Sequence, residues 1–114
     1  MIVIGIETSC DETAISLVEN GRQILSNAVA SSLNLHKRYG GVVPEIATRH
    51  HVELINFVLA GALSKAGVSL KKVGLVAVVY GPGLVGALLI GLSLAKVLSL
   101  SLNRPLVGIN HLQA

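Results

Sequence analysis

Short apolar runs that end in turn residues alternate along the chain with longer stretches of helical periodicity. Residues 2–7 form an apolar run that is typical of a buried strand. Residues 13–19 and 22–30 are two further runs, and the Asn20-Gly21 dipeptide between them is the strongest short-range signal for a hairpin. The first part of the chain therefore predicts three consecutive strands.

The second part of the chain alternates between helices and strands. Pro44 suits the first turn of a helix, and helical spacing of apolar residues predicts a helix over 44–66 that ends before Gly67. The β-branched run at 73–80 is typical of a central parallel strand. The remaining predicted elements are a helix at 84–102, a strand at 104–110 and a further helix that opens at His111.

This order of elements predicts a single α/β domain. Three antiparallel strands followed by alternating helices and parallel strands, in the order βββαβαβ, is the arrangement of ribonuclease-H-like folds and of the lobes of actin-like ATPases. Residues 1–114 contain no linker, internal repeat or low-complexity tract. We therefore expect them to form one ribonuclease-H-like lobe around a mixed five-stranded sheet.

The predicted helix at 84–102 is apolar on almost every side. Its narrow polar stripe consists of Ser93, Lys96, Ser99 and Asn103. Because a helix that is hydrophobic on most faces is covered on most faces, one side is expected to pack on the sheet and the other to need a further cover. Lys96 near its middle argues against a membrane span, since a lysine there costs about 2.5–3.5 kcal/mol on insertion.

The charged residues are unevenly distributed. The net charge is +3, and all six acidic residues lie before residue 54. The cations beyond that point are Lys65, Lys71, Lys72, Lys96 and Arg104. A basic bias suits a nucleic acid or another anionic partner.

The single cysteine, Cys10, excludes an internal disulfide framework and fits a reducing compartment. No basic region precedes the first apolar run, so the sequence predicts no signal peptide. We therefore expect a cytoplasmic protein that does not enter the membrane.

The segment "ETSCDET" at 7–13 concentrates polar groups between the first two predicted strands. Hydroxyls and backbone N–H groups in a turn can hold phosphate oxygens, while carboxylates such as those of Asp11 and Glu12 can accept a proton or orient a metal-bound water. A solvated turn whose side chains satisfy local backbone groups explains the same composition. The residue types alone leave both interpretations open.

Gly81, Gly83 and Gly86 match the G-x-G-x-x-G pattern of dinucleotide-binding turns. That pattern also requires an acidic residue about 20 positions later, and the sequence has no acid after Glu53, so NAD binding is excluded. A phosphate or carboxylate contact at the start of the following helix remains expected, with Gly83 as the candidate.

The histidines do not form a zinc-peptidase motif. His50 and His51 are adjacent and are followed by Glu53, which differs from H-E-x-x-H, and we expect both at the surface. His111 is the candidate metal ligand near the end of the chain.

Four segments together resemble a known family: "GIETSCDET", "HKRYGGVVPEIATRHH", "GPGLVGALLIG" and "GINHLQA". They are similar to the bacterial tRNA threonylcarbamoyladenosine transferases, formerly labelled O-sialoglycoprotein endopeptidases or glycoproteases. The resemblance is collinear over all 114 residues and corresponds to about the first third of a family member. The chain is therefore expected to be a truncated N-terminal lobe that ends just inside its metal site and is itself inactive.

The resemblance implies an acyl transfer from threonylcarbamoyl-adenylate to the exocyclic amine of the adenosine next to the tRNA anticodon. It implies one divalent metal, iron or zinc, held by His111, by a histidine four positions later and by an aspartate of a second domain.

The resemblance also implies roles for further residues. Asp11 is the candidate for positioning or proton transfer, with support from Glu12. The candidates for the phosphate side of the adenylate are Thr8, Ser9, Cys10 and Gly83. The weaker candidates for contacts to the tRNA backbone are Lys37, Arg38 and Arg49.

The expected partners are tRNA, a related non-catalytic subunit and an accessory ATPase. The resemblance implies that helices 44–66 and 84–102 pair with their counterparts in the partner subunit as a four-helix bundle. Without that subunit, a homodimer through the same helices is expected. Two alternatives remain, a non-catalytic scaffold lobe and the metallopeptidase of the older label, which no zinc-peptidase motif supports.

Overall fold

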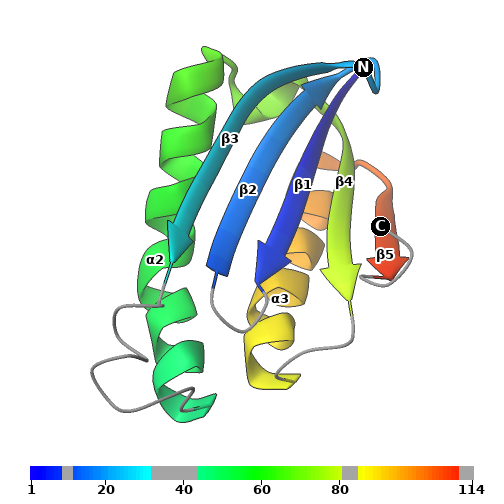
Figure 1. Ribbon diagram of the computed structural model, residues 1–114. Helices are drawn as coiled ribbons and strands as arrows, with labels where there is room; N and C mark the ends of the chain where they lie inside the picture. The colour runs from blue at the N-terminus through cyan, green and yellow to red at the C-terminus, as the bar shows by residue number, and fades with distance from the viewer. Residues whose placement is uncertain (9–11, 32–43, 81–84, 111–114) are drawn as a thin grey trace.

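The computed structural model describes residues 1–8, 12–31, 44–80 and 85–110. The strands of these residues form one five-stranded sheet. Figure 1 shows that this sheet is twisted and that long helices pack against it. The elements in chain order are β1 (Ile2–Thr8), β2 (Glu12–Glu19), β3 (Gln23–Ser31), α2 (Pro44–Ala66), the short 3₁₀ helix η1 (Leu70–Lys72), β4 (Val73–Tyr80), α3 (Val85–Leu102) and β5 (Leu106–Asn110). The predicted order βββαβαβ is confirmed.

The strands lie in the order β3-β2-β1-β4-β5. β1 pairs with β2 and β2 with β3 in antiparallel register, while β1 pairs with β4 and β4 with β5 in parallel register. β1, β3, β4 and β5 consequently run in the same direction. Their carboxyl ends meet at one end of the sheet.

Alternation along the strands gives the sheet a buried face and an open face. Six side chains point toward the helices and are almost fully buried: Ile4, Ile6, Ile15, Leu17, Val76 and Val78. The helices complete this core with Ile55, Val58 and Ala62 from α2 and with Ala95 and Leu98 from α3. Both helices lie on the same side of the sheet (Figure 1), so only one face of the sheet belongs to this core.

The connections at the amino end of the sheet are tight turns with left-handed residues. Asn20 and Gly21 have φ of 55° and 69°, as the hairpin signal requires. Gly67, with φ of 65°, ends α2: the N–H of Gly67 donates to the carbonyl of Ser64 and the N–H of Val68 to that of Leu63. This is a Schellman cap, which satisfies the last carbonyls of the helix.

The predicted start of the last strand is wrong. β5 begins at Leu106, whereas the apolar pattern predicts a strand from residue 104. Asn103, with φ of 53°, caps α3, and the N–H of Arg104 bonds to the carbonyl of Ser99. Arg104 therefore belongs to the helix cap. Pro105 has no N–H to donate to a strand ladder, and it contacts β4 through its carbonyl, which accepts the Val76 N–H over 3.0 Å.

Candidate functional site

The segments that contain the candidate site residues adjoin the carboxyl end of the sheet. We define this end by five residues: Thr8, Ser31, Tyr80 and Asn110, which end β1, β3, β4 and β5, and Glu12, which begins β2. Figure 1 shows these strand ends grouped at the lower end of the sheet. Ligands of α/β folds bind in the crevice outside the carboxyl ends of the strands.

Most of the predicted site residues lie outside the described residues. They are Ser9, Cys10 and Asp11 between β1 and β2, Lys37 and Arg38 between β3 and α2, Gly83 between β4 and α3, and His111 after β5. The topology nevertheless attaches all four of these segments to the carboxyl end. The strand order therefore brings together anchor points that are far apart in the sequence.

Two further candidates lie in described elements. Glu12 begins β2 and pairs with Ser31 of β3, and Arg49 lies in the first half of α2. Only their backbone positions are described, so the roles predicted for Glu12 and Arg49 stay predictions. The start of α2 and the start of β2 both adjoin the carboxyl end.

Thr8 is the site candidate whose side chain the structure describes fully. It continues the row of Ile4 and Ile6, and only 1% of its surface is exposed. The backbone N–H of Gly91 in α3 donates to Thr8 Oγ1 over 3.0 Å. The hydroxyl thus binds the protein's own helix, and a phosphate contact through Thr8 stays a prediction.

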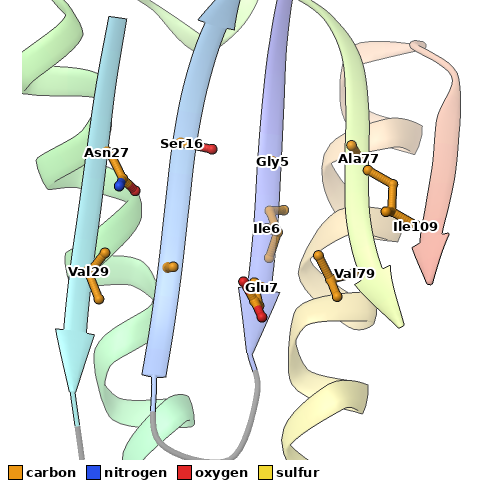
Figure 2. A pocket seen from close by; sticks show the side chains of 10 residues that line it. Gly5, Ile6, Glu7, Ser16, Asn27, Val29, Ala77, Val79 and Ile109 are labelled. Atoms are coloured by element: carbon orange, nitrogen blue, oxygen red, sulfur yellow. The ribbon is translucent and has the colours of Figure 1, made fainter. Parts of the chain in front are cut away.

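The open face of the sheet carries a cavity of about 360 Å³. It is lined by Gly5, Ile6, Glu7, Ala14, Ser16, Asn27, Val29, Ala77, Val79 and Ile109. Small residues from the central strands form its floor, and Figure 2 shows the Glu7 carboxylate near the end of β1. The cavity therefore extends along the open face toward the carboxyl end.

Glu7 is the candidate that the sequence reasoning missed. It stands between Ile6 and Thr8, which both point into the core. Strict alternation along a strand places Glu7 on the opposite face, and that signal was present in the sequence. The lining of the cavity therefore includes one carboxylate, that of Glu7.

The described residues do not supply a complete metal site. Among them, no group of three His, Cys, Asp or Glu side chains is close enough to hold a metal ion. The predicted ligand, His111, lies outside the described residues, so the iron or zinc site stays a prediction. Neither α2 nor α3, as far as they are described, is long and apolar enough to cross a membrane.

Comparison with known proteins identifies the family. The family model described as tRNA N6-adenosine threonylcarbamoyltransferase matches residues 23–114. The chain belongs to this family. A protein of that name from Thermosipho melanesiensis is 59% identical over 98% of the chain, and one from Bacillus subtilis is also 59% identical over 98%. The chain covers 34% and 32% of these two relatives, so it spans about a third of their length.

Solved structures support the fold. A structure described as YeaZ from Pseudomonas aeruginosa superposes with a TM-score of 0.69 at 20% identity, covering 96% of this chain and 42% of that one. The T. thermophilus RuvC structure in complex with Holliday junction substrate superposes with a TM-score of 0.60 at 15% identity, covering 98% of this chain and 66% of that one. At these identities the similarity concerns the fold alone, and it confirms the predicted α/β ribonuclease-H-like class.

Proposed function

We propose that this chain forms the ribonuclease-H-like lobe of an enzyme that transfers threonylcarbamoyl from threonylcarbamoyl-adenylate to the N6 amine of the adenosine next to the anticodon in tRNA. The observation that carries the proposal is the family match over residues 23–114. The attachment of every candidate segment to the carboxyl end of one sheet supports it.

The substrate is a mixed anhydride and is already activated. The enzyme must therefore hold the phosphate, orient the acyl group and remove a proton from the attacking amine. Asp11 accepts or positions that proton in this proposal, and Glu12 supports it. Glu7 lines the cavity on the open face of the sheet and adds a carboxylate there.

The phosphate side of the adenylate is assigned to two segments, one that carries a hydroxyl and a thiol and one that carries a glycine. Ser9 and Cys10 follow β1, and Gly83 precedes α3. Backbone N–H groups at the start of a helix favour an anion, which is the reason for this assignment.

Iron or zinc at His111 would supply Lewis-acid polarisation of the anhydride when bound. The described residues do not provide a complete set of ligands for a metal ion. The roles above are therefore assigned to side chains of this chain and do not depend on the metal. We propose that the tRNA phosphates are contacted by the cationic side chains of Lys37, Arg38 and Arg49. The same proposal includes an accessory ATPase as a partner and a cytoplasmic location.

The transfer itself is testable. A polypeptide of the relatives' full length that carries this chain is incubated with tRNA and threonylcarbamoyl-adenylate, together with the partner subunit. Mass spectrometry of the digested tRNA is expected to show threonylcarbamoyladenosine at the position next to the anticodon. Absence of the modified nucleoside, with a related family enzyme active in the same assay, would refute the proposal.

The outer side of the helices is proposed to bind a partner. Four large apolar side chains are exposed there: Phe57 on α2 by 77%, and Leu89, Val97 and Leu100 on α3 by 54%, 58% and 83%. Leu89, Val97 and Leu100 follow helical spacing and form one stripe on α3, which also includes the exposed Ser93 and Lys96. Exposed apolar patches of this kind mark interaction surfaces. We assign the stripe to the related subunit and, in its absence, to a second copy of the chain.

Leu100→Lys tests this assignment, because Leu100 is exposed and a lysine there leaves the core intact. Sedimentation over a concentration series is expected to show that wild type associates and that Leu100→Lys is monomeric. Ile24→Lys is the matched control, since Ile24 is 69% exposed on β3, away from the helices. Equal association of Leu100→Lys and wild type would refute the assignment. Leu92 is unsuitable for this test because it is half-buried against the core.

A further inference from the structure

One hydrogen bond joins the candidate site to the body of the helix layer. Gly91 in α3 and Thr8 in β1 are separated by 83 residues, and the Gly91 N–H donates to Thr8 Oγ1 over 3.0 Å inside the protein. Thr8 is 1% exposed and Gly91 is buried. The bond is therefore shielded from water, where the loss of one partner is most costly.

At this point the backbone of the helix lies directly against the Thr8 side chain, because Gly91 contributes no side chain of its own. A Cβ built on Gly91 would lie 2.5 Å from Thr8 Oγ1, 3.4 Å from Thr8 Cγ2 and 3.5 Å from Ile6 Cγ2. Any residue larger than glycine would force the helix and the strand apart or turn the Thr8 side chain. The close approach thus depends on both residues.

The contact lies next to the segments that carry the candidate chemistry. Thr8 is the last residue of β1 and directly precedes the segment with Asp11. α3 begins at Val85, directly after the segment with Gly83, and Gly91 lies within its first two turns. One contact therefore fixes the end of β1 relative to the start of α3.

We propose that Thr8 is a positioning residue of the transferase, which acts through Gly91 to hold the proton-transfer segment and the phosphate segment in register. This inference rests on the proposed function. In this proposal the Thr8 hydroxyl does not make the phosphate contact that the family resemblance implies. It sets the position of the end of β1, which directly precedes the segment with Asp11, relative to the start of α3. A misplacement of about 1 Å can cost roughly 100-fold in rate, so a small displacement at this contact is sufficient.

Three variants in a polypeptide of the relatives' full length separate the contribution of the Thr8 hydroxyl from that of the close approach at Gly91. Thr8→Val keeps the shape and removes the hydroxyl, Thr8→Ser keeps the hydroxyl, and Gly91→Ala adds the Cβ. We expect Thr8→Val and Gly91→Ala to lower kcat for transfer by roughly 100-fold while the KM for tRNA changes little. Thr8→Ser is expected to restore the rate to near wild type.

Ser26→Ala is the matched structural control. Ser26 Oγ donates to the carbonyl of Ala62 over 2.7 Å, which is a second buried bond from the sheet to a helix. Ser26 lies on the edge strand β3, at the register of Ile4 and away from the carboxyl end. Ser26→Ala is expected to lower the melting temperature as Thr8→Val does and to leave kcat unchanged. Equal loss of kcat in Ser26→Ala and Thr8→Val would reduce Thr8 to a structural role.

Hydrogen exchange distinguishes failure of the inference from failure of the proposed function. If the wild-type polypeptide does not modify tRNA, the proposed function fails, and exchange in the 114-residue chain still tests the contact. Thr8→Val is expected to speed exchange at residues 85–91 relative to residues 92–102. Unchanged exchange, or a wild-type kcat in both Thr8→Val and Gly91→Ala, overturns the inference. If Thr8→Val does not fold, Gly91→Ala and Thr8→Ser carry the same comparison.

Discussion

The two ends of the sheet differ in what holds them and in what they are made of. At the amino end, the connections are tight turns closed by local bonds, such as the one from the Arg22 N–H to the Glu19 carbonyl. Cations are exposed along this end, namely Arg22, Lys65, Lys71, Lys72 and Arg104. At the carboxyl end, the strands are followed in the sequence by the segments that contain the acids, hydroxyls and glycines of the candidate site.

This difference indicates that the amino end contributes mainly to stability and the carboxyl end mainly to the proposed reaction. Turns with left-handed residues are determined by their own few residues, and changing them alters the free energy of unfolding. A site at strand ends is assembled from segments distant in the sequence, and changing it alters the reaction. Substitutions at the amino end should therefore lower stability and leave transfer unchanged. Substitutions at the carboxyl end should lower the rate of transfer, with a loss of stability as well where they remove a buried contact such as that of Thr8.

The largest expected effect is at the carboxyl end. Asp11→Asn keeps the size of the side chain and removes its charge and its capacity to accept a proton. In a polypeptide of the relatives' full length, we expect turnover to fall by about 100-fold or more. The melting temperature should match that of wild type by circular dichroism. Wild-type turnover with normal partner binding would assign Asp11 to a structural turn.

The next effect is at the amino end. Gly67→Ala places a Cβ on a residue with φ of 65°, which disfavours the Schellman cap of α2. We expect a loss of about 1–2 kcal/mol in the free energy of unfolding, measured by urea denaturation, with the rate of transfer unchanged. A loss of transfer in the folded variant would break the proposed separation between the two ends.

Gly61→Ala is the matched control for that substitution. Gly61 lies in α2 without a positive φ, and a Cβ there would meet nothing within 4 Å. Alanine has the higher helix propensity, so we expect a gain of roughly 0.5–1 kcal/mol. Opposite signs for Gly61→Ala and Gly67→Ala in the same denaturation series would attribute the second effect to backbone conformation. A loss in both would indicate that α2 tolerates no added methyl group.

The smallest effect is expected at the hairpin. Asn20 Oδ1 accepts a bond from the amino group of Met1 over 2.6 Å at the surface. Asn20→Gly removes this acceptor, which destabilises the turn, but glycine adopts the positive φ more easily than asparagine, which stabilises it. We expect the two effects on the free energy of unfolding to offset each other to within a few tenths of a kcal/mol. The urea midpoint is expected to stay within error of wild type, whereas Asn20→Ala should lower it because alanine disfavours that φ. A large loss for Asn20→Gly would show that the terminal contact dominates the turn.

The sequence predicted the fold well where the signals are local. The bounds of α2 are confirmed at 44 and 66 because proline and glycine mark its two ends. The start of β5 was predicted two residues too early, because the cap at Asn103 depends on the preceding helix and not on the apolar pattern that follows.

The candidate site was predicted less completely, since it depends on strand order. Residue types identified Asp11, Gly83 and His111, but only the order β3-β2-β1-β4-β5 shows that their segments leave from one end of the sheet. Alternation from Ile4 and Ile6 was sufficient to place Thr8 under the helices and Glu7 on the open face. The contact with Gly91 spans most of the chain and has no local signal.

The most direct test of the proposed site is to locate where a nucleotide binds on the sheet. Adenosine monophosphate is titrated into a ¹⁵N-labelled polypeptide of the relatives' full length, and amide shifts are mapped onto the sheet. Our account predicts that shifts concentrate at Thr8, Glu12, Tyr80, Val85 and Asn110, which border the carboxyl end. Shifts concentrated at residues 20–22, 67–69 and 103–105 would place the nucleotide at the amino end and contradict the account.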